Sequence, residues 1–336
     1  MDNRITWLIP VLNGMPYLTE TLASIESQTY KNWEVLVWDN GSTDGTLEEL
    51  EKWIPNRLPG RVITGEPHSV GGSLARMVQE CNTELCARMD ADDINLPDRL
   101  EKQLEFLSTH PEIAVLGSRV YLVNEEGNSL EDLYPLPINH EEIVYEMLFR
   151  NPISHPSVIF RRSIVLQVGN YREFPNIEDY DLWLRIAASH KLENLAKPLL
   201  KYRIHNKSET RIATQENRIR KAISDCVCQN APLIFGCTEN DMRLLVDRNH
   251  PCAIYPILRI AKHLKKNQID KSTNMLNSAS FSRSIGYLIA DKDIISRIFI
   301  AAFSPDKSLL CREFKSMSKA IIRKISRASK FLTVSN

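Results

Sequence analysis

Short apolar runs alternate with amphipathic stretches along the first part of the chain. Four of these runs are predicted to be buried strands, because they are uninterrupted and rich in branched or aromatic side chains. They cover residues 5–9, 34–38, 61–64 and 85–89. Between them, apolar residues recur at helical spacing, as Leu18, Leu22 and Ile25 do. Strands that alternate with helices predict an α/β fold with a largely parallel sheet and helices on both faces.

The later pattern is mixed and then becomes helical. Further strands are predicted at residues 113–123, 157–160 and 199–204, and helices at 100–107, 141–149 and 163–168. Another helix begins within the acidic run at 178–181. Few strand signals remain beyond about residue 209. We therefore expect a first domain over residues 1–208 and a helical C-terminal extension over residues 209–336.

Polar residues follow three of the first four predicted strands. Asn13 and Gly14 come after the first strand, Asp39 follows the second, and Asp90-Ala91-Asp92-Asp93 follows the fourth. Pro10 is expected to end the first strand, because proline has no N–H to donate to a sheet. In parallel α/β sheets, ligands bind beyond the carboxyl ends of the strands. The three clusters therefore predict a site of nucleotide size along one edge of the sheet.

The acidic loop at 90–93 holds three carboxylates in four residues. On the protein surface, water could solvate them. At the end of a buried strand they are costly without a cation, because burial of unpaired charge is expensive. Their position therefore favours a divalent metal, and both Mg and Mn suit carboxylate ligands.

The composition is that of an ordinary soluble globular protein. Of 336 residues, 43% are hydrophobic and 25% are charged, and the formal net charge is +0. No whole-chain charge therefore points to nucleic acid or membrane. The seven cysteines are scattered, the N-terminus does not resemble a signal peptide, and no apolar run reaches about 18 residues. We expect a cytoplasmic protein with reduced thiols and no nucleic-acid partner.

A local basic bias marks residues 306–336. Eight lysines and arginines face only Asp306 and Glu313 there, while apolar residues such as Ile321 and Ile325 recur every three or four positions. A basic amphipathic helix of this kind can make peripheral contact with the inner, anionic membrane surface. The alternative is a helix that packs on the rest of the protein with a solvated basic face.

An ordered series of motifs resembles the family 2 glycosyltransferases, which have the GT-A fold. The series comprises I-P-V-L-N at 9–13, W-D-N-G-S-T-D-G at 38–45, R-M-D-A-D-D at 88–93, L-P-D-R-L-E at 96–101, H-P-S-V-I-F at 155–160, E-D-Y-D-L-W at 178–183 and Y-R-I-H at 202–205. The resemblance implies a Rossmann-like, mixed but mainly parallel sheet. It also implies metal-dependent sugar transfer from a nucleotide sugar, with inversion at the anomeric carbon.

The same resemblance implies a biological setting. Relatives of this length commonly build bacterial surface polysaccharides, such as O-antigen, capsule or exopolysaccharide. Their acceptors are glycans or lipid-linked glycans. We therefore expect an acceptor hydroxyl of this kind.

The resemblance also implies roles on the donor side. Asp39 would read the base, typically uracil, through its N3–H, so a UDP-sugar is the expected donor. Arg76 would contact the base or the diphosphate, and Asp90 would bind the ribose. Further donor contacts are expected from Pro10, Leu12, Asn13 and Ala91. The alternative for Asp39 is a turn residue that caps its own loop.

Two residues would hold the metal. Asp92 matches the family's metal ligand, and His205 matches a histidine that completes the metal site in many relatives. The ion would neutralise negative charge on the departing nucleoside diphosphate. An imidazole ligand suits Mn better than Mg. The alternative for His205 is a surface histidine near a strand end, and the role of Asp93 is left undefined.

Asp179 matches the family's catalytic base, which takes the proton of the acceptor hydroxyl, and Glu178 is the second choice. Such a base works best when burial or neighbouring acids bring its pKa nearer the operating pH. Glu178 and Asp181 are the expected neighbours. The alternative is an acidic run that only suits the positive N-terminal end of a helix. His155 is a candidate for the acceptor side, although a lone histidine is more often structural.

Some positions depart from the family pattern. Leu12 stands where relatives often carry an aromatic side chain that stacks on the base, and Asn40 stands where many have a second aspartate. A catalytically inert nucleotide-sugar binding or scaffold protein is the alternative function, but Asp92 and Asp179 are both present. The E-D-Y-D-L-W motif argues against a retaining transferase or a nucleotidyltransferase, because an inverting reaction is what needs that base.

Overall fold

The structure is a computed structural model that describes residues 4–133, 136–148, 150–174, 176–206 and 218–246. The chain falls into two compact units. One holds residues up to 144 together with 151–226, and the other holds 145–150 and residues from 227 on. All candidate site residues lie in the first unit. Within the described residues, none of the helices has both the length and the apolar character needed to cross a membrane.

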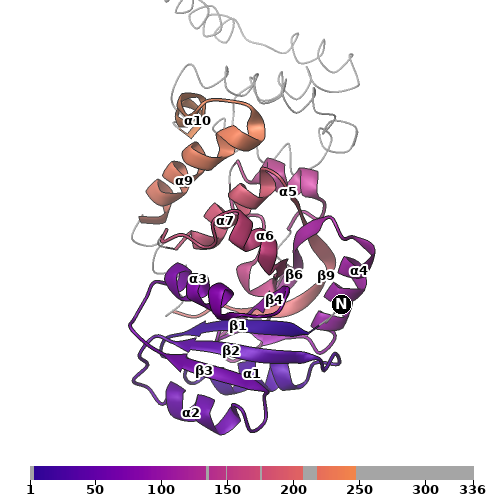
Figure 1. Cartoon of the computed structure of the whole chain (residues 1–336), viewed down its shortest axis with the longest axis vertical. Coiled ribbons are helices and arrows are strands. Elements are labelled where there is room, and N and C mark those ends of the chain that lie inside the picture. The colour runs from indigo at the N-terminus through magenta and orange to yellow at the C-terminus, as the bar shows by residue number, and fades with distance from the viewer. Residues whose placement is uncertain (1–3, 134–135, 149, 175, 207–217, 247–336) are drawn as a thin grey trace, which may run out of the picture. The chain divides into compact units, whose positions relative to one another are not determined.

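The first half of the sheet follows the alternating pattern of the sequence. Its four parallel strands are β1 (Ile5–Val11), β2 (Trp33–Asp39), β3 (Gly60–Thr64) and β4 (Leu85–Arg88). The helices between them are α1 (Leu18–Glu26), α2 (Thr46–Trp53) and α3 (Val70–Glu80). Figure 1 shows β1 between β2 and β4. The loops that leave the carboxyl ends of these strands therefore share one edge of the sheet.

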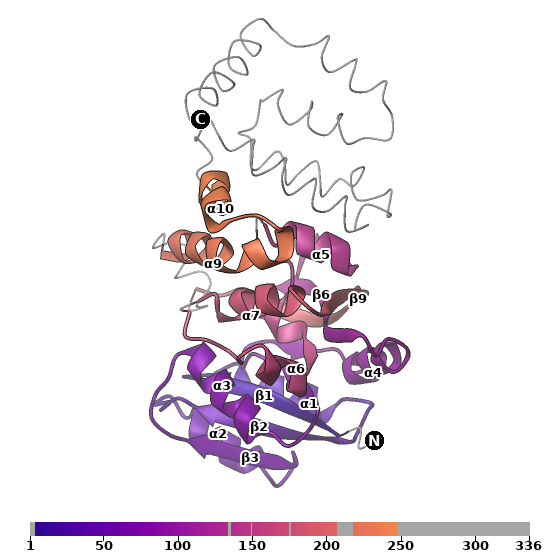
Figure 2. The same ribbon diagram turned by 45° about the horizontal axis from the view of Figure 1, so that its top comes forward.

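Apolar layers cover both faces of β1. Ile5, Trp7 and Ile9 belong to a core that also takes in buried residues of α1, α2 and α4 (Arg99–Thr109). Side chains alternate along a strand, so Leu8 points to the opposite face, where α3 contacts β1 and β2 (Figure 2). A strand that is buried on both faces needs an uninterrupted apolar run, which is why this half of the sheet is visible in the sequence.

Pro10 lies inside β1, which corrects the expectation that it ends the strand. β1 continues to Val11, and Pro10 stands opposite Trp38 of β2. On its other side, β4 pairs with β1 only as far as Leu8, whose carbonyl accepts the N–H of Met89. The backbone of Pro10 faces the same side as that of Leu8, beyond the paired stretch. Proline is tolerated there because its missing N–H leaves no ladder bond unmade.

The second half adds antiparallel strands, so the sheet is mixed. These strands are β5 (Ile94–Asn95), β6 (Ile113–Val123), β7 (Ser129–Leu133), β8 (Ile159–Arg161) and β9 (Lys191–Arg203). The sheet order is β3-β2-β1-β4-β8-β6-β9-β5, and β7 pairs with β6. β8 runs antiparallel to both β4 and β6, whereas β9 runs parallel to β6. The mixed α/β architecture confirms the predicted fold class.

Helices and one turn complete the described chain. They are α5 (His140–Glu146), the 3-10 turn η1 (His155–Ser157), α6 (Arg162–Gln167), α7 (Glu178–Ala187), α9 (Arg218–Phe235) and α10 (Glu239–Val246). The described residues beyond 209, at 218–246, form α9 and α10, which agrees with the helical pattern predicted for that region. The basic segment at 306–336 lies outside the described residues, and the domain boundary at residue 208 stays a prediction.

β9 differs most from its prediction. It begins at Lys191, whereas the sequence pattern starts at Leu199. The added stretch mixes charged and apolar residues and contains Pro198, so its alternation is weak. It forms a strand because β6 pairs with it along most of its length. The sequence pattern also does not predict β5, which has two residues and pairs with β9.

Candidate active site

The loop after β4 gathers three carboxylates at the carboxyl end of the parallel strands. Oxygen atoms of Asp90, Asp92 and Asp93 all lie within 4.8 Å of one another. The loop after β1 is adjacent, since a Cβ placed on Gly14 would lie 3.5 Å from the Cβ of Ala91. Two of the three polar clusters of the sequence therefore meet at one edge of the sheet. A set of hard oxygen ligands at this spacing fits a divalent cation.

His205 lies against Asp92. Its Nε2 atom is 2.7 Å from Oδ2 of Asp92, and its ring centroid is 5.0 Å from that of Tyr17. The side chain of His205 is only 9% exposed, so it is not the surface histidine of the alternative interpretation. A separation of 2.7 Å is a hydrogen bond, so a proton lies between the two atoms. A cation bound by both groups would have to displace that proton.

Asp93 links the acidic loop to β9 and so brings His205 to it. Its Oδ1 accepts the backbone N–H of Arg203 at 2.8 Å, and Arg203 Nε donates to the carbonyl of Asp92, also at 2.8 Å. Burial raises the pKa of Asp93 well above its usual range, and the charges of Asp92 and Asp90 add to the rise. Its Oδ2 has no hydrogen-bond partner within the described chain. Asp93 therefore has a structural role that the sequence leaves undefined.

The loop after β2 is held by its own hydrogen bonds. The hydroxyl of Ser42 donates to Oδ1 of Asp39 at 2.5 Å, and the Ser42 N–H lies 3.3 Å from both carboxylate oxygens. Asp39 is buried and caps its own loop, as the alternative interpretation has it. Asn40 is also buried, and its Oδ1 accepts the His68 N–H and the Ser73 hydroxyl, each at 3.1 Å. Asn40, which differs from the residue common in the family, therefore holds the start of α3 beside β2.

The other residues expected on the donor side differ in position. Asn13 Oδ1 accepts the N–H of Thr43 at 2.9 Å and so joins the loops after β1 and β2. Leu12 is 58% exposed beside it, and Pro10 is buried within β1. Arg76 is exposed on α3. Among the described hydrogen bonds and ion pairs, none links Arg76 to Asp39 or to the acidic loop.

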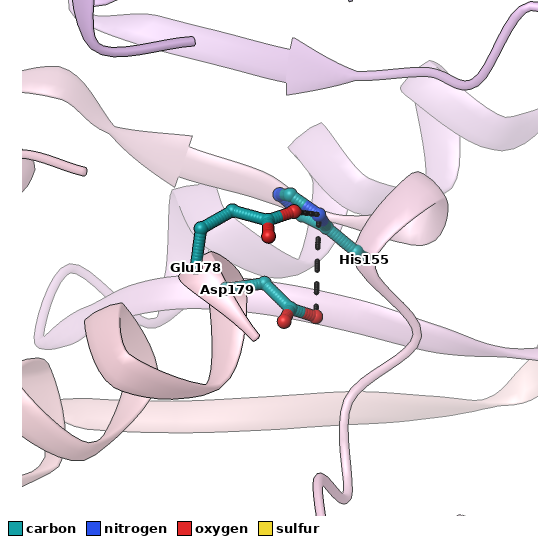
Figure 3. Close-up of side chains that lie close together, drawn as sticks. All are labelled: His155, Glu178 and Asp179. Atoms are coloured by element: carbon teal, nitrogen blue, oxygen red, sulfur yellow. Dashed lines mark ion pairs between the residues drawn. The ribbon is translucent and has the colours of Figure 1, made fainter. Parts of the chain in front are cut away.

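A second acidic cluster forms where α7 begins (Figure 3). The carboxylates of Glu178 and Asp179 lie 3.9 Å and 4.0 Å from Nδ1 of His155, which comes from η1. The other ring nitrogen of His155, Nε2, is 3.0 Å from the hydroxyl of Tyr171. Burial lowers the pKa of His155 well below its usual value, and the positive charge of Arg88 adds to this effect. The imidazole is therefore neutral and buried.

Asp179 has the surroundings of a general base. Its Oδ2 accepts Nδ2–H of Asn151 at 2.6 Å, and its Oδ1 accepts the backbone N–H of Tyr180 at 2.7 Å. Burial raises the pKa of Asp179 to about 6, although these hydrogen bonds and the charge of Arg88 oppose the rise. Burial, together with the charge of Asp179, raises the pKa of Glu178 to about 8. Near neutral pH Asp179 is therefore the more readily ionised of the two carboxyl groups.

Asp181 does not serve as the acidic neighbour that the sequence predicts. Its carboxylate is fully buried and forms ion pairs with Arg172 and Arg185, the latter at 2.7 Å from Nη2 to Oδ2. These two arginines compensate its charge and anchor α7. Glu178 is therefore the acid that bears directly on Asp179.

Arg88 is a site residue that the sequence analysis does not identify. Its side chain is 4% exposed, and Nη1 forms an ion pair with Oδ2 of Asp90. Its charge also lowers the pKa values of Glu178 and Asp179. His155, Glu178 and Asp179 have ligand atoms close enough for a metal, but this arginine already brings a positive charge to them. A single arginine at the end of a strand gives no sequence signal of its partners, and neither do Asn151 and Tyr171, which lie outside helices and strands.

The two clusters suit different chemistry. The loop at 90–93 with His205 offers carboxylate and imidazole ligands, which fit Mn and Mg. The cluster around Asp179 offers a partly buried carboxylate that is largely deprotonated at neutral pH and can accept a proton. Asp90 bears on the pKa of Glu178, so the clusters lie within electrostatic range of each other. The arrangement can therefore hold an anionic ligand through a cation at one end and accept a proton at the other.

Comparisons with known proteins find one family. A statistical model of "Glycosyl transferase family 2" matches residues 6–168. The O-antigen biosynthesis glycosyltransferase WbnJ of Escherichia coli is 36% identical over 225 residues, which cover 63% of this chain and 86% of WbnJ. The amylovoran biosynthesis glycosyltransferase AmsE of Erwinia amylovora is 34% identical over 188 residues, which cover 55% of this chain and 70% of AmsE.

Solved structures share the fold at low sequence identity. S. aureus TarS 1–349, in complex with UDP-GlcNAc, aligns with a TM-score of 0.59 and 16% identity, covering 93% of this chain and 89% of TarS 1–349. The mannosyltransferase PcManGT from Pyrobaculum calidifontis, in complex with GDP-Man and Mn2+, aligns with a TM-score of 0.52 and 15% identity. That alignment covers 92% of this chain and 85% of PcManGT. At such identity the likeness concerns the fold alone.

Proposed function

Because this chain belongs to glycosyl transferase family 2, we propose that it transfers a sugar from a nucleotide sugar to an acceptor hydroxyl with inversion at the anomeric carbon. One observation carries the inverting assignment. Asp179 is a partly buried carboxylate, with its side chain 14% exposed, oriented by Asn151, and its pKa is raised to about 6. A carboxylate with that pKa is mostly ionised at neutral pH and still basic enough to take a hydroxyl proton as the new bond forms.

The donor side is proposed to be the edge formed by the loops after β1, β2 and β4. The expected contacts are Pro10, Leu12, Asn13, Asp39, Arg76, Asp90, Ala91 and Asp92. The carboxylate of Asp39 already accepts the Ser42 hydroxyl. To accept a uracil N3–H it would have to bind both donors or release that hydroxyl. Two proteins of similar fold were solved with UDP-GlcNAc and GDP-Man, which supports a nucleotide-sugar donor in general. A UDP-sugar remains our specific proposal, on the strength of Asp39.

A divalent metal, Mn or Mg, is proposed to act with the donor. Asp92 and His205 would hold it, and their 2.7 Å contact supports this pairing because both side chains are already oriented toward each other. Burial beside Asp90 and Asp92 disfavours the charged form of Asp93, whose Oδ2 has no hydrogen-bond partner among the described residues, and a bound cation would offset that cost. When bound, the ion would neutralise charge on the departing diphosphate.

The proposed acceptor is a glycan or a lipid-linked glycan in the synthesis of a bacterial surface polysaccharide. WbnJ and AmsE carry the names of O-antigen and amylovoran biosynthesis enzymes, which supports this class of product. A cytoplasmic location follows from the proposal, since nucleotide sugars are made there. Peripheral contact with the inner membrane surface is proposed from the basic segment at 306–336.

The first experiment screens nucleotide sugars for donor hydrolysis and transfer with Mn and with Mg, using the wild type and Asp179→Asn. We expect the variant to bind the donor with wild-type affinity in calorimetry and to transfer no sugar. Asp98→Asn is the matched control, because Asp98 pairs with Lys197 at the protein surface. Wild-type turnover by Asp179→Asn would refute the base assignment.

An inert binding or scaffold protein is the second candidate, and the same screen tests it. Donor binding without turnover by the wild type under any metal would favour that candidate. Membrane contact is tested by sedimentation with anionic liposomes at low and high salt, with and without residues 306–336. Equal sedimentation of both proteins would remove the basic segment from the proposal.

A further inference from the structure

We infer that Arg88 is a positioning residue that joins the donor-side and acceptor-side carboxylates through one buried positive charge and keeps the base at Asp179 ready to accept a proton. The inference rests on the proposed function, because it concerns the proton that Asp179 takes. It adds a residue that touches neither the sugar nor the acceptor in our scheme but acts through two carboxylates that do.

The topology of the sheet places Arg88 between the two clusters. It is the last residue of β4, and β4 lies between β1 and β8. Its backbone N–H donates to the carbonyl of Val158 at 2.9 Å, three residues after His155. Its own carbonyl accepts Nη2–H of Arg99 at 3.0 Å. The backbone of Arg88 is therefore held beside η1, and the acidic loop begins two residues later.

The guanidinium of Arg88 is a buried cation with incomplete local compensation. Nη1 forms an ion pair with Asp90, and neither Nε nor Nη1 has a hydrogen-bond partner of normal geometry among the described residues. Burial opposes its charge, yet the charge and hydrogen bond of Asp90 outweigh that effect and raise the pKa of Arg88 above its ordinary value, with smaller contributions from Tyr171 and Glu178. Arginine stays charged in proteins, so a buried guanidinium needs negative partners. Asp90 is one partner, and the Asp179 carboxylate, whose pKa the charge of Arg88 lowers, is the second.

Other cations of the first unit have different partners. Arg172 and Arg185 both pair with Asp181. Arg99 donates to backbone carbonyls, among them that of Pro156 at 2.7 Å. His155 faces Asp179 but is neutral, for the reasons given above. The cation among the largest influences on Asp179 is Arg88, whose charge lowers the pKa of that carboxyl.

The remaining groups that face Asp179 are negative or neutral. Glu178 precedes it on α7, and its carboxyl is protonated at neutral pH. Asn151 donates a neutral hydrogen bond, and Tyr171 and Tyr180 are buried phenols whose pKa values are raised well above the ordinary value. Loss of the Arg88 charge would therefore raise the pKa of Asp179 further, because nothing else there offsets burial with a full positive charge.

The test is the pH dependence of kcat/KM for sugar transfer by the wild type, Arg88→Met and Arg88→Lys. The acid limb is the part of the profile where kcat/KM rises with pH. We expect Arg88→Met to raise the apparent pKa of this limb by about 1 pH unit, which is typical of losing a nearby opposite charge. Arg88→Lys keeps the charge and should restore the limb to near the wild-type position. Arg162→Met is the matched control, since Arg162 donates to the carbonyl of Val78, away from both clusters. It should leave the limb where it is.

A merely structural role for Arg88 would lower the rate without moving the acid limb, and that result would overturn the inference. If Arg88→Met does not fold, the double variant Arg88→Met/Asp90→Asn removes the ion pair as a unit and is compared with Asp90→Asn alone. The apparent pKa of the acid limb should be higher in the double variant than in Asp90→Asn, and equal values would again overturn the inference. If the wild type transfers no sugar from any donor, the proposed function itself fails, which is a distinct outcome.

Discussion

The Nε2 atom of His205 lies 2.7 Å from Oδ2 of Asp92, although 113 positions separate the two residues in the chain. Asp93 supports this contact, because its Oδ1 accepts the backbone N–H of Arg203 at the end of β9. β9 pairs with β5, which begins directly after the acidic loop. The metal ligands proposed here therefore meet because one strand pairing and one buried carboxylate bring the end of β9 to the loop.

Replacement of His205 by alanine should weaken Mn2+ binding by at least about tenfold, because even the loss of a residue that only supports a metal ligand costs about that much. Mg2+ binding should change less, since Mg prefers oxygen ligands. Calorimetric titration of each ion in the presence of UDP measures both. His190→Ala serves as a control for loss of an imidazole outside the two clusters. Unchanged Mn2+ affinity in His205→Ala would exclude His205 as a ligand.

The rate of transfer should rise with pH through about 6, where Asp179 loses its proton. The sign follows from its role: a base must be deprotonated, and the deprotonated fraction grows as the pH passes the pKa. Glu178→Gln should keep this limb in place, because Glu178, with a pKa raised to about 8, is already protonated there. Measurement of kcat/KM from pH 5 to 9 tests both statements. An inactive Glu178→Gln and a wild-type limb near 8 would instead make Glu178 the base.

Arg99→Met should lower the free energy of unfolding by about 3–5 kcal/mol, because it leaves several buried carbonyl oxygens without a donor, at about 1–3 kcal/mol each. Arg99 is fully buried, where burial lowers its pKa to about 9. Its Nη2 donates to the carbonyls of Arg88 and Val158 at 3.0 Å and 3.1 Å. Urea unfolding measures the loss.

The control for Arg99 is Arg61→Met, which breaks an exposed ion pair with Glu80. Such pairs contribute about 1 kcal/mol or less. Similar losses in the two variants would mean that Arg99 does not hold β4 and η1 together.

Gly60→Ala should destabilise the protein by about 3 kcal/mol or more, because the new methyl group cannot be accommodated. Gly60 has a φ of +147°, and a Cβ there would lie 2.0 Å from the backbone oxygen of Val35 in β2. Gly45→Ala is the control. Its φ is +93° with nothing within 4 Å of the added Cβ, so only backbone strain of about 1 kcal/mol is expected. Thermal unfolding of the two variants compares them directly, and equal melting temperatures would contradict the steric explanation.

The parallel half of the sheet can be predicted from the sequence, because the signal for each strand lies within the strand itself. β1 and β2 are covered on both faces, so their residues form unbroken apolar runs, and the clusters at Asn13, Asp39 and Asp90 follow because parallel strands end on the same edge. The motif at Asp179 is also local, since a helix that starts at an acidic pair needs only neighbouring residues. The sequence by itself thus determined the fold class, and it pointed to the sheet edge of the candidate site and to the residues proposed to act there.

Tertiary structure decided which of those residues have partners and what their charges do. Pairing of β4 with β8 puts Arg88 beside the turn of His155, and burial then makes that arginine a cation shared by two clusters. Burial against Arg172 and Arg185 takes Asp181 away from the base, which no local pattern reveals. Distances across strands and the pKa values of buried groups depend on residues that are far apart in the chain. Their chemistry is therefore set only when the sheet is assembled.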